Sequence, residues 1–132
     1  MQLKVWNKKF FGTVLNCIDG RTQIPVIKWM KEKFGLDYVD LITEPGIDKV
    51  LSQGKWTETE RLKEKTIISI NAHNSNVVAV VGHFDCAANP VSDFQHFRDI
   101  IASTYEVESW GLPVKVVGLW VDEFFYVHVI SE

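Results

Sequence analysis

The chain has 132 residues, of which 46% are hydrophobic, and a net charge of −3. This composition fits one globular domain spanning residues 1–132. Its scattered Lys and Arg residues argue against binding to nucleic acid or to an anionic membrane surface. No apolar run approaches the ~20 residues of a membrane-spanning helix. The segment from Met1 to Lys9 lacks the apolar stretch of a signal peptide, so we expect a cytoplasmic protein.

Apolar runs alternate with helical patterns along the chain, which predicts an α/β fold with a mainly parallel sheet. A strand is predicted at 13–18. The helix after it has Pro25 in its first turn and Gly35 as its C-terminal cap. A second strand is predicted at 38–43, and a loop or short helix around 47–53.

The second half of the chain begins with a helix that runs towards Asn74, with Thr57 and Glu60 as a capping box. Three isoleucines supply its expected buried face, namely Ile67, Ile70 and Ile68. Residues 77–81 form a continuous apolar run, which is typical of a strand covered on both faces.

Another helix is predicted after Ser92, which with Gln95 forms a second capping box. Four apolar residues at helical spacing form its predicted apolar set, namely Phe94, Phe97, Ile101 and Tyr105. Two closing strands are expected at 114–121 and 124–130, joined by a hairpin at Asp122-Glu123. The predicted architecture is a single α-β-α domain with about four parallel strands and an antiparallel C-terminal edge strand.

Two short strings carry the chemistry of the chain: Cys17-Ile18-Asp19-Gly20-Arg21 and His83-Phe84-Asp85-Cys86. Each follows a predicted buried strand at its carboxyl end, where open α/β sheets bind ligands. If the two strands are neighbours, Cys17, His83 and Cys86 converge on one point. Two thiolates and an imidazole suit zinc and leave one position of a tetrahedron for water.

Asp19 and Arg21 lie close enough to the first thiol to act on such a water. A carboxylate accepts the hydrogen of the nucleophile and orients its lone pair at the substrate. A guanidinium pairs with a carboxylate through two hydrogen bonds and favours its charged form. We therefore expect Asp19 and Arg21 to act as a dyad.

Each residue also has a simpler interpretation. A single buried cysteine is usually a small hydrophobic side chain, and Cys17 with Cys86 could instead form a redox pair without metal. Asp85 is expected to cap backbone amides rather than to bind metal. Three further histidines are interpreted as surface or core residues, with His96 as a possible proton shuttle: His73, His96 and His128.

The joint pattern resembles the β-class carbonic anhydrases, whose motifs are Cys-x-Asp-x-Arg and His-x-x-Cys. The resemblance spans 13–129 and also includes Val80-Val81-Gly82 before the second motif and Val116-Val117-Gly118 in a later strand. It implies zinc bound by Cys17, His83 and Cys86, and a catalytic dyad of Asp19 and Arg21. The implied reaction is the reversible hydration of carbon dioxide to bicarbonate by zinc-bound hydroxide, which makes the protein a lyase.

The chain departs from the family in three places. It begins almost at the first core strand, so the family's N-terminal helices are not expected. Thr43-Glu44-Pro45-Gly46 stands where the family tends to have Arg-Asn-Ala-Gly, and Ala87 stands where a glycine commonly follows the second cysteine. These changes leave two alternatives open: a zinc hydrolase of a related small molecule such as carbonyl sulfide, and an inactive zinc-binding or regulatory module.

The expected partners are a small-molecule substrate and further copies of the chain. The aromatic run Phe124-Phe125-Tyr126, and apolar surface that the absent helices would leave uncovered, favour a homodimer or higher homo-oligomer.

Overall fold

The computed structural model describes residues 9–132. The predicted absence of a signal peptide rests mainly on residues 1–8, which lie outside the described residues. Along the chain the elements are β1 (Phe11–Asn16), α2 (Gly20–Phe34), β2 (Tyr38–Thr43), α3 (Ile47–Gln53), α4 (Trp56–His73), β3 (Val77–His83), α5 (Asp93–Glu108), β4 (Lys115–Val121) and β5 (Val127–Ser131). Across residues 9–132, no helix is both long and apolar enough to cross a membrane.

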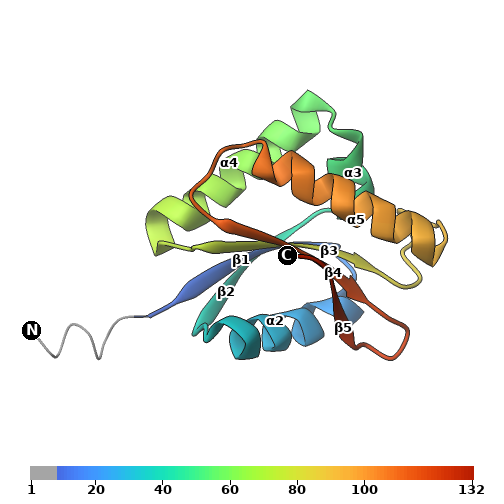
Figure 1. Cartoon of the computed structure of the whole chain (residues 1–132), viewed down its shortest axis with the longest axis horizontal. Helices are drawn as coiled ribbons and strands as arrows, with labels where there is room; N and C mark the ends of the chain where they lie inside the picture. Colours follow the sequence, from blue (N-terminus) through green and yellow to red (C-terminus); the bar gives the residue numbers. More distant parts are fainter. Residues whose placement is uncertain (1–8) are drawn as a thin grey trace, which may run out of the picture.

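The sheet within these residues has five strands in the order β2-β1-β3-β4-β5. β1 pairs in parallel with β2 and β3, and β3 pairs in parallel with β4. β5 runs antiparallel to β4 at the edge. Helix α2 covers one face of the sheet, and α3, α4 and α5 cover the other (Figure 1). The predicted α-β-α architecture and the antiparallel C-terminal edge are confirmed.

The sheet has one apolar layer on each face. Val14 and Val81 pack with Val26 and Met30 of α2. The other layer is built from residues of the sheet and of the helices on the opposite face, among them Leu15, Ile47, Leu51, Leu62 and Val80. Every residue of β3 is buried, as its continuous apolar run predicts, because the central strand is covered on both faces.

The order of the strands brings the two candidate site motifs, residues 17–21 and 83–86, together. From β1 the chain crosses to β2 on one side, whereas β3 and β4 lie on the other side. The strand order therefore reverses between β1 and β3, and this is where open α/β sheets bind ligands. Leu15 of β1 is in register with Val80 of β3, so both strands end at the same edge of the sheet.

Several predicted helix details are wrong. Helix α2 begins at Gly20, so Pro25 lies inside the helix and not in its first turn. The N-cap of α2 is Asp19, whose side chain accepts a hydrogen bond from the Arg21 N–H in the first turn. Helix α4 begins at Trp56 with Lys55 at its N-cap and no side-chain cap; Thr57 therefore lies within the first turn and does not cap it.

The buried faces of α4 and α5 also differ from the prediction. Helix α4 buries a row of mainly polar residues, namely Thr59, Leu62, Thr66 and Ser69. The side chain of Ile68 is exposed. In α5, Ser92 caps the helix as predicted, because its hydroxyl accepts a hydrogen bond from the Gln95 N–H. The buried residues of α5 are His96, Ile100, Ser103, Thr104 and Val107.

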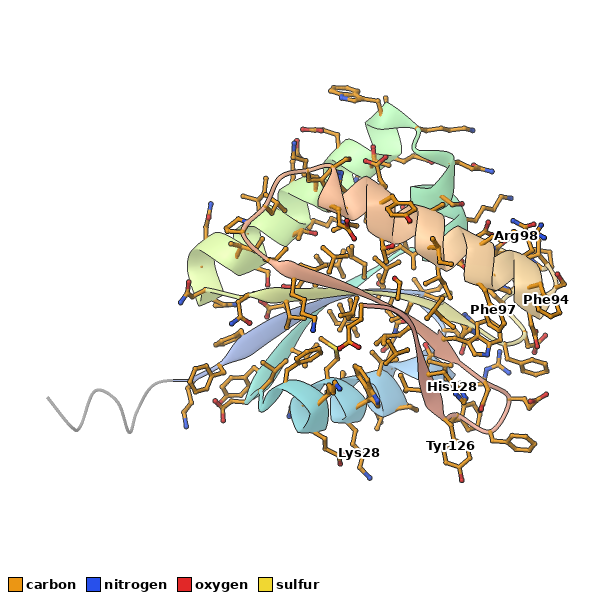
Figure 2. The ribbon with its side chains drawn as sticks, viewed as in Figure 1. Lys28, Phe94, Phe97, Arg98, Tyr126 and His128 are labelled. Carbon is orange, nitrogen blue, oxygen red and sulfur yellow. The ribbon has the colours of Figure 1, made fainter. Side chains whose placement is uncertain are left out.

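The predicted apolar set of α5 lies mostly towards solvent. The side chain of Phe94 is 76% exposed and that of Tyr105 is 67% exposed. Figure 2 shows Phe94 and Arg98 at one end of α5, and Tyr126 and His128 on the hairpin. The physical reason is that His96 and Ser103 form hydrogen bonds with Asp48 of α3. These bonds turn the stripe that also contains Ile100 and Val107 inwards, so Phe94 and Tyr105 face outwards.

Candidate metal centre

Three candidate ligands come from the carboxyl ends of two adjacent strands. Cys17 directly follows β1, and His83 is the last residue of β3. Cys86 follows a tight turn in which Asp85 adopts φ 56°. All three side chains are buried. The turn reverses the chain immediately after β3 and returns Cys86 towards Cys17.

The ligand atoms of these residues converge. The two Sγ atoms lie 4.0 Å apart, and one ligand atom from each of Cys17, His83 and Cys86 lies within 4.8 Å of the others. Among residues 9–132, this is the only group of three or more His, Cys, Asp or Glu side chains whose ligand atoms lie close enough together to hold a metal ion. Two sulfurs and one nitrogen suit a tetrahedral zinc site that keeps its fourth position open.

The orientation of His83 tests whether a metal fits. Its Nδ1 lies 2.8 Å from the Phe84 carbonyl oxygen, so Nδ1 carries the proton and donates it. Its Nε2 is buried and has no hydrogen-bond partner among the described residues. A buried nitrogen lone pair without a partner costs free energy. A metal ion between Nε2 and the two sulfurs would satisfy it, and the backbone contact of Nδ1 would fix the tautomer.

The two thiols do not share charge equally. The Cys86 thiol lowers the pKa of Cys17 against the opposing effect of burial, and N–H groups of Gly46 and Asp19 add to the lowering. The pKa of Cys86 is raised, because its proton is shared with Cys17 and because it is buried. Burial acts to lower the pKa of His83, but the Cys17 sulfur and the Phe84 carbonyl outweigh it and raise that pKa. Cys17 is therefore the thiol of the pair that loses its proton first.

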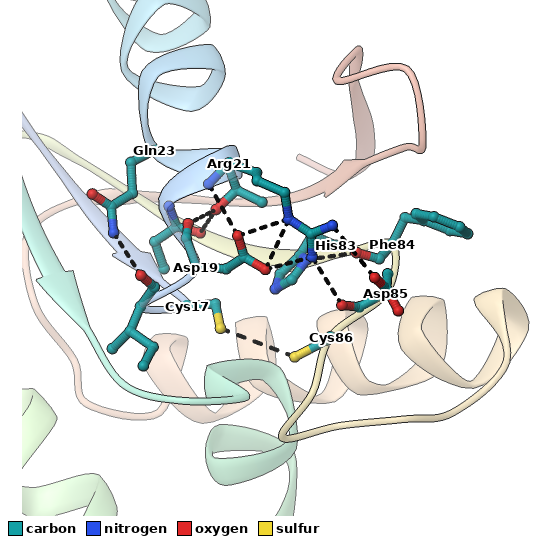
Figure 3. Close-up of polar contacts among 11 residues, drawn as sticks. Cys17, Asp19, Arg21, Gln23, His83, Phe84, Asp85 and Cys86 are labelled. Atoms are coloured by element: carbon teal, nitrogen blue, oxygen red, sulfur yellow. Dashed lines mark hydrogen bonds and ion pairs between the residues drawn. The ribbon is translucent and has the colours of Figure 1, made fainter.

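Asp19 and Arg21 form the expected pair. Asp19 caps α2, because its Oδ1 accepts the Arg21 backbone N–H at 3.0 Å. Its carboxylate also accepts Arg21 Nε at 3.0 Å and Nη2 at 2.7 Å. These contacts with Arg21 lower the pKa of Asp19 to about 2 and raise that of Arg21. Asp19 therefore remains an oriented carboxylate beside Cys17 (Figure 3).

Asp85 has a different role from the predicted one. Its carboxylate accepts Arg21 Nη1 at 3.3 Å, and its carbonyl oxygen accepts Arg21 Nη2 at 3.2 Å. Arg21 thus lies between Asp19 of the first string and Asp85 of the second (Figure 3). The prediction that Asp85 caps backbone amides did not foresee this link, because it requires both strings to be seen together.

An open cavity of about 210 Å³ reaches the first cysteine. Its lining is mainly apolar and consists of Cys17, Ile18, Asp19, Pro45, Ala87 and Ala88. The two segments that depart from the family pattern therefore both contribute to this cavity, Pro45 from one and Ala87 from the other.

A second polar cluster behind the site was missed from the sequence. His96 Nδ1 lies 2.6 Å from Asp48 Oδ2, and both side chains are 2% exposed. Asn89 donates to the other oxygen of Asp48 at 3.1 Å. The spacing of His96 with Ile100, Ser103 and Val107 is helical, and this stripe is the signal that could have identified the buried face of α5.

Comparisons with known proteins agree with this arrangement. The family model described as "Putative carbonic anhydrase" matches residues 7–131. No curated protein sequence matches the chain. The fold is similar to that of the β-carbonic anhydrase CafA of the fungal pathogen Aspergillus fumigatus, with a TM-score of 0.50 and 12% identity, over 99% of this chain and 80% of that one. Because the family match covers almost the whole sequence, the protein belongs to this carbonic anhydrase family.

Proposed function

We propose that this protein is a zinc-dependent lyase that catalyses the reversible hydration of carbon dioxide to bicarbonate. The observation that carries the proposal is the convergence of three ligand atoms within 4.8 Å of one another, beside a carboxylate already paired with Arg21. Membership of the carbonic anhydrase family supports the same reaction class.

Cys17, His83 and Cys86 would hold the zinc ion. The unpartnered Nε2 of His83 and the proton-sharing thiols support this ligand set. The chemistry that zinc supplies when bound is the activation of water as a nucleophile near neutral pH. Because the three residues are buried, they would also shield the reaction from bulk solvent.

Asp19 would orient the attacking water by accepting a hydrogen bond at its carboxylate. With a pKa of about 2, the carboxylate stays ionised at neutral pH and accepts a hydrogen bond without storing the proton. Arg21 would hold this orientation, since it binds both Asp19 oxygens and is itself held by the Asp85 carbonyl. A rotation of Asp19 towards the ligands would then cost the contacts with Arg21.

The substrate would bind in the cavity of about 210 Å³ next to Cys17. The apolar side chains of Ile18, Pro45 and Ala87 suit a small, linear, uncharged molecule and exclude water from one side of it. Asp19, also in the lining, is the polar group that meets the nucleophile. Carbon dioxide fits both requirements.

Stopped-flow hydration of carbon dioxide in a pH-indicator buffer tests the proposal. Zinc-loaded protein should accelerate hydration well above the uncatalysed rate, and the same protein stripped with a chelator should not. Zinc-loaded protein with no acceleration would reject the enzymatic function and favour a metal-binding or regulatory module.

Carbonyl sulfide is a second candidate substrate. Pro45 and Ala87 both line the cavity, and both stand where the chain departs from the family pattern, so the changes lie where substrates are selected. Turnover of the two gases by one preparation separates the candidates. Faster turnover of carbon dioxide would reject carbonyl sulfide hydrolysis as the function.

We also propose a homo-oligomer in the cytoplasm. Exposed aromatic side chains support self-association, among them Phe94, Phe124 and Tyr126. Free thiols at Cys17 and Cys86 fit a reducing compartment. Light scattering that gives the mass of one chain at micromolar concentration would contradict the oligomer, and fractionation of the source cells tests the location.

A further inference from the structure

We propose that Asn89 is a positioning residue for the metal site, holding the Cys86 loop through a hydrogen-bonded cluster formed with Asp48, His96 and Asp99. The proposal rests on the proposed function, since it assumes that Cys86 binds zinc. It goes beyond that function because none of these four residues is a candidate ligand or lies in the cavity wall.

Asp48, Asn89 and His96 of this cluster are buried, and hydrogen bonds join them to one another and to the half-buried Asp99. His96 Nδ1 and Asp48 Oδ2 lie 2.6 Å apart, with both side chains 2% exposed. A Cβ atom added at Gly82 would lie 2.8 Å from Asp48 Oδ2, so the carboxylate is packed against the residue that precedes His83. Buried charges are retained only where partners compensate for lost hydration. This cluster therefore has one preferred geometry.

Asn89 connects the cluster to the metal-site loop. Its Nδ2 donates to Asp48 Oδ1 at 3.1 Å and to Asp99 Oδ2 at 3.0 Å. Asp48 belongs to α3 and Asp99 to α5, while Asn89 lies in the connection between β3 and α5. One side-chain amide thus fixes this connection to two helices at once.

The backbone of the same loop contacts Cys86. The Asn89 N–H donates to the Cys86 carbonyl oxygen at 3.3 Å. Backbone N–H groups of Ala88 and Asn89 also form hydrogen bonds with the Cys86 sulfur. Because hydrogen bonds to a sulfur stabilise the thiolate, an Asn89 side chain that fixes these donors would tune the ligand.

The loop that follows Cys86 also packs against Gly46, whose backbone contacts the other thiol, Cys17. Gly46 adopts φ 60°, and a Cβ atom there would lie 3.0 Å from the backbone of Ala88. The Gly46 N–H acts on the Cys17 sulfur, and Asp48 follows two residues later. Holding Asp48 and Asn89 together therefore keeps the backbone donors of both sulfurs in place.

The test measures zinc affinity by competition with a chromophoric chelator, and the absorption spectrum of the cobalt(II)-substituted protein. Asn89→Ala should weaken zinc binding about 10- to 100-fold. The sulfur-to-cobalt charge-transfer band should move to longer wavelength, since a thiolate that loses N–H donors holds its electrons less tightly. Asp99→Ala removes one of the two acceptors at a half-buried position and should give a smaller change in the same direction.

Ser69→Ala is the matched control. The Ser69 hydroxyl is also buried and bonds to two partners, Asp40 at 2.7 Å and Thr13 at 2.6 Å, but it lies in α4, away from the cluster. This variant should lose stability and keep both the zinc affinity and the cobalt band of the unaltered protein. A general loss of packing would instead move all three variants alike.

The outcomes separate the inference from the function on which it rests. Unaltered affinity and an unmoved cobalt band in folded Asn89→Ala and Asp99→Ala would overturn the positioning role alone. Failure of the unaltered protein to bind zinc would overturn the proposed metal site and the positioning role with it. If Asn89→Ala does not fold, Asp99→Ala decides the question by the same two measurements.

Discussion

The sulfur atoms of Cys17 and Cys86 lie 4.0 Å apart although 69 positions separate them in the chain. Two parallel strands that end at one edge of the sheet create this proximity. His83 ends the second strand and presents a buried Nε2 without a partner among the described residues. Together these features define a site that could hold a cation.

Asp19→Asn should lower kcat for carbon dioxide hydration about 10- to 100-fold, because the amide cannot both pair with Arg21 as a carboxylate does and accept the nucleophile's hydrogen. Stopped-flow assays of the zinc-loaded variant and of the zinc-loaded unaltered protein measure this decrease in kcat. Asp85→Asn is the control, since Asp85 also contacts Arg21 but keeps its carbonyl contact after substitution. Equal activity in Asp19→Asn and the unaltered protein would remove the dyad from the mechanism.

Gly46→Ala should destabilise the protein more than Gly35→Ala. Both glycines have positive φ, 60° and 64°, but a Cβ atom at Gly46 would meet the Ala88 backbone at 3.0 Å whereas nothing lies within 4 Å at Gly35. The backbone strain is about 1–2 kcal/mol at either site, and overpacking adds about 1–3 kcal/mol at Gly46. Urea unfolding of both variants checks the difference; equal losses would contradict the close approach of these two loops.

The β4–β5 hairpin should weaken in acid. Asp122 accepts the backbone N–H groups of Phe124 at 2.8 Å and Tyr126 at 3.0 Å. Its hydrogen bond with His128 lowers its pKa below the ordinary 3.8. A carboxyl whose pKa is lower when folded contributes stability above its unfolded pKa and loses it as the pH falls through the folded value. Carboxyl NMR should report a higher Asp122 pKa in His128→Gln, and an unchanged pKa would contradict the contact.

Removal of the metal should lower the melting temperature. A ligand that binds only the folded chain, at 1,000 times its dissociation constant, adds about 4 kcal/mol, which corresponds to about 10–20 °C in a domain of this size. Scanning calorimetry before and after chelation measures the shift, and adding zinc back should restore it. The same melting temperature in both states would show that the three residues do not bind zinc in the folded protein.

The sequence predicted the parts of this protein that depend on local patterns. The apolar run of β3 identified a strand buried on both faces, and the position of the two motifs after strands identified the site. The buried face of α5 was wrong because hydropathy favours Phe94 and Tyr105 as inward residues. His96 points inwards because Asp48, 48 positions away, supplies its partner. The helical spacing of His96 with Ile100 and Val107 could have indicated the buried face, but its pairing with Asp48 has no signature in a local window.

The contact of Asp85 with Arg21 was missed for the same reason. Each motif could be interpreted alone, but Asp85 reaches Arg21 only once β1 and β3 are adjacent. Similarly, the helix start at Gly20 follows from the Asp19 side chain bonding to the Arg21 N–H, whereas the prediction gave Pro25 that role.

Metal content per chain most directly tests the central claim. Elemental analysis of protein purified without chelators should give about one zinc per chain, and Cys86→Ser should lose most of it, because two ligands hold the ion far less tightly than three. An unaltered protein without zinc that also fails to bind added zinc would contradict the account, as would a Cys86→Ser variant that retains a full equivalent.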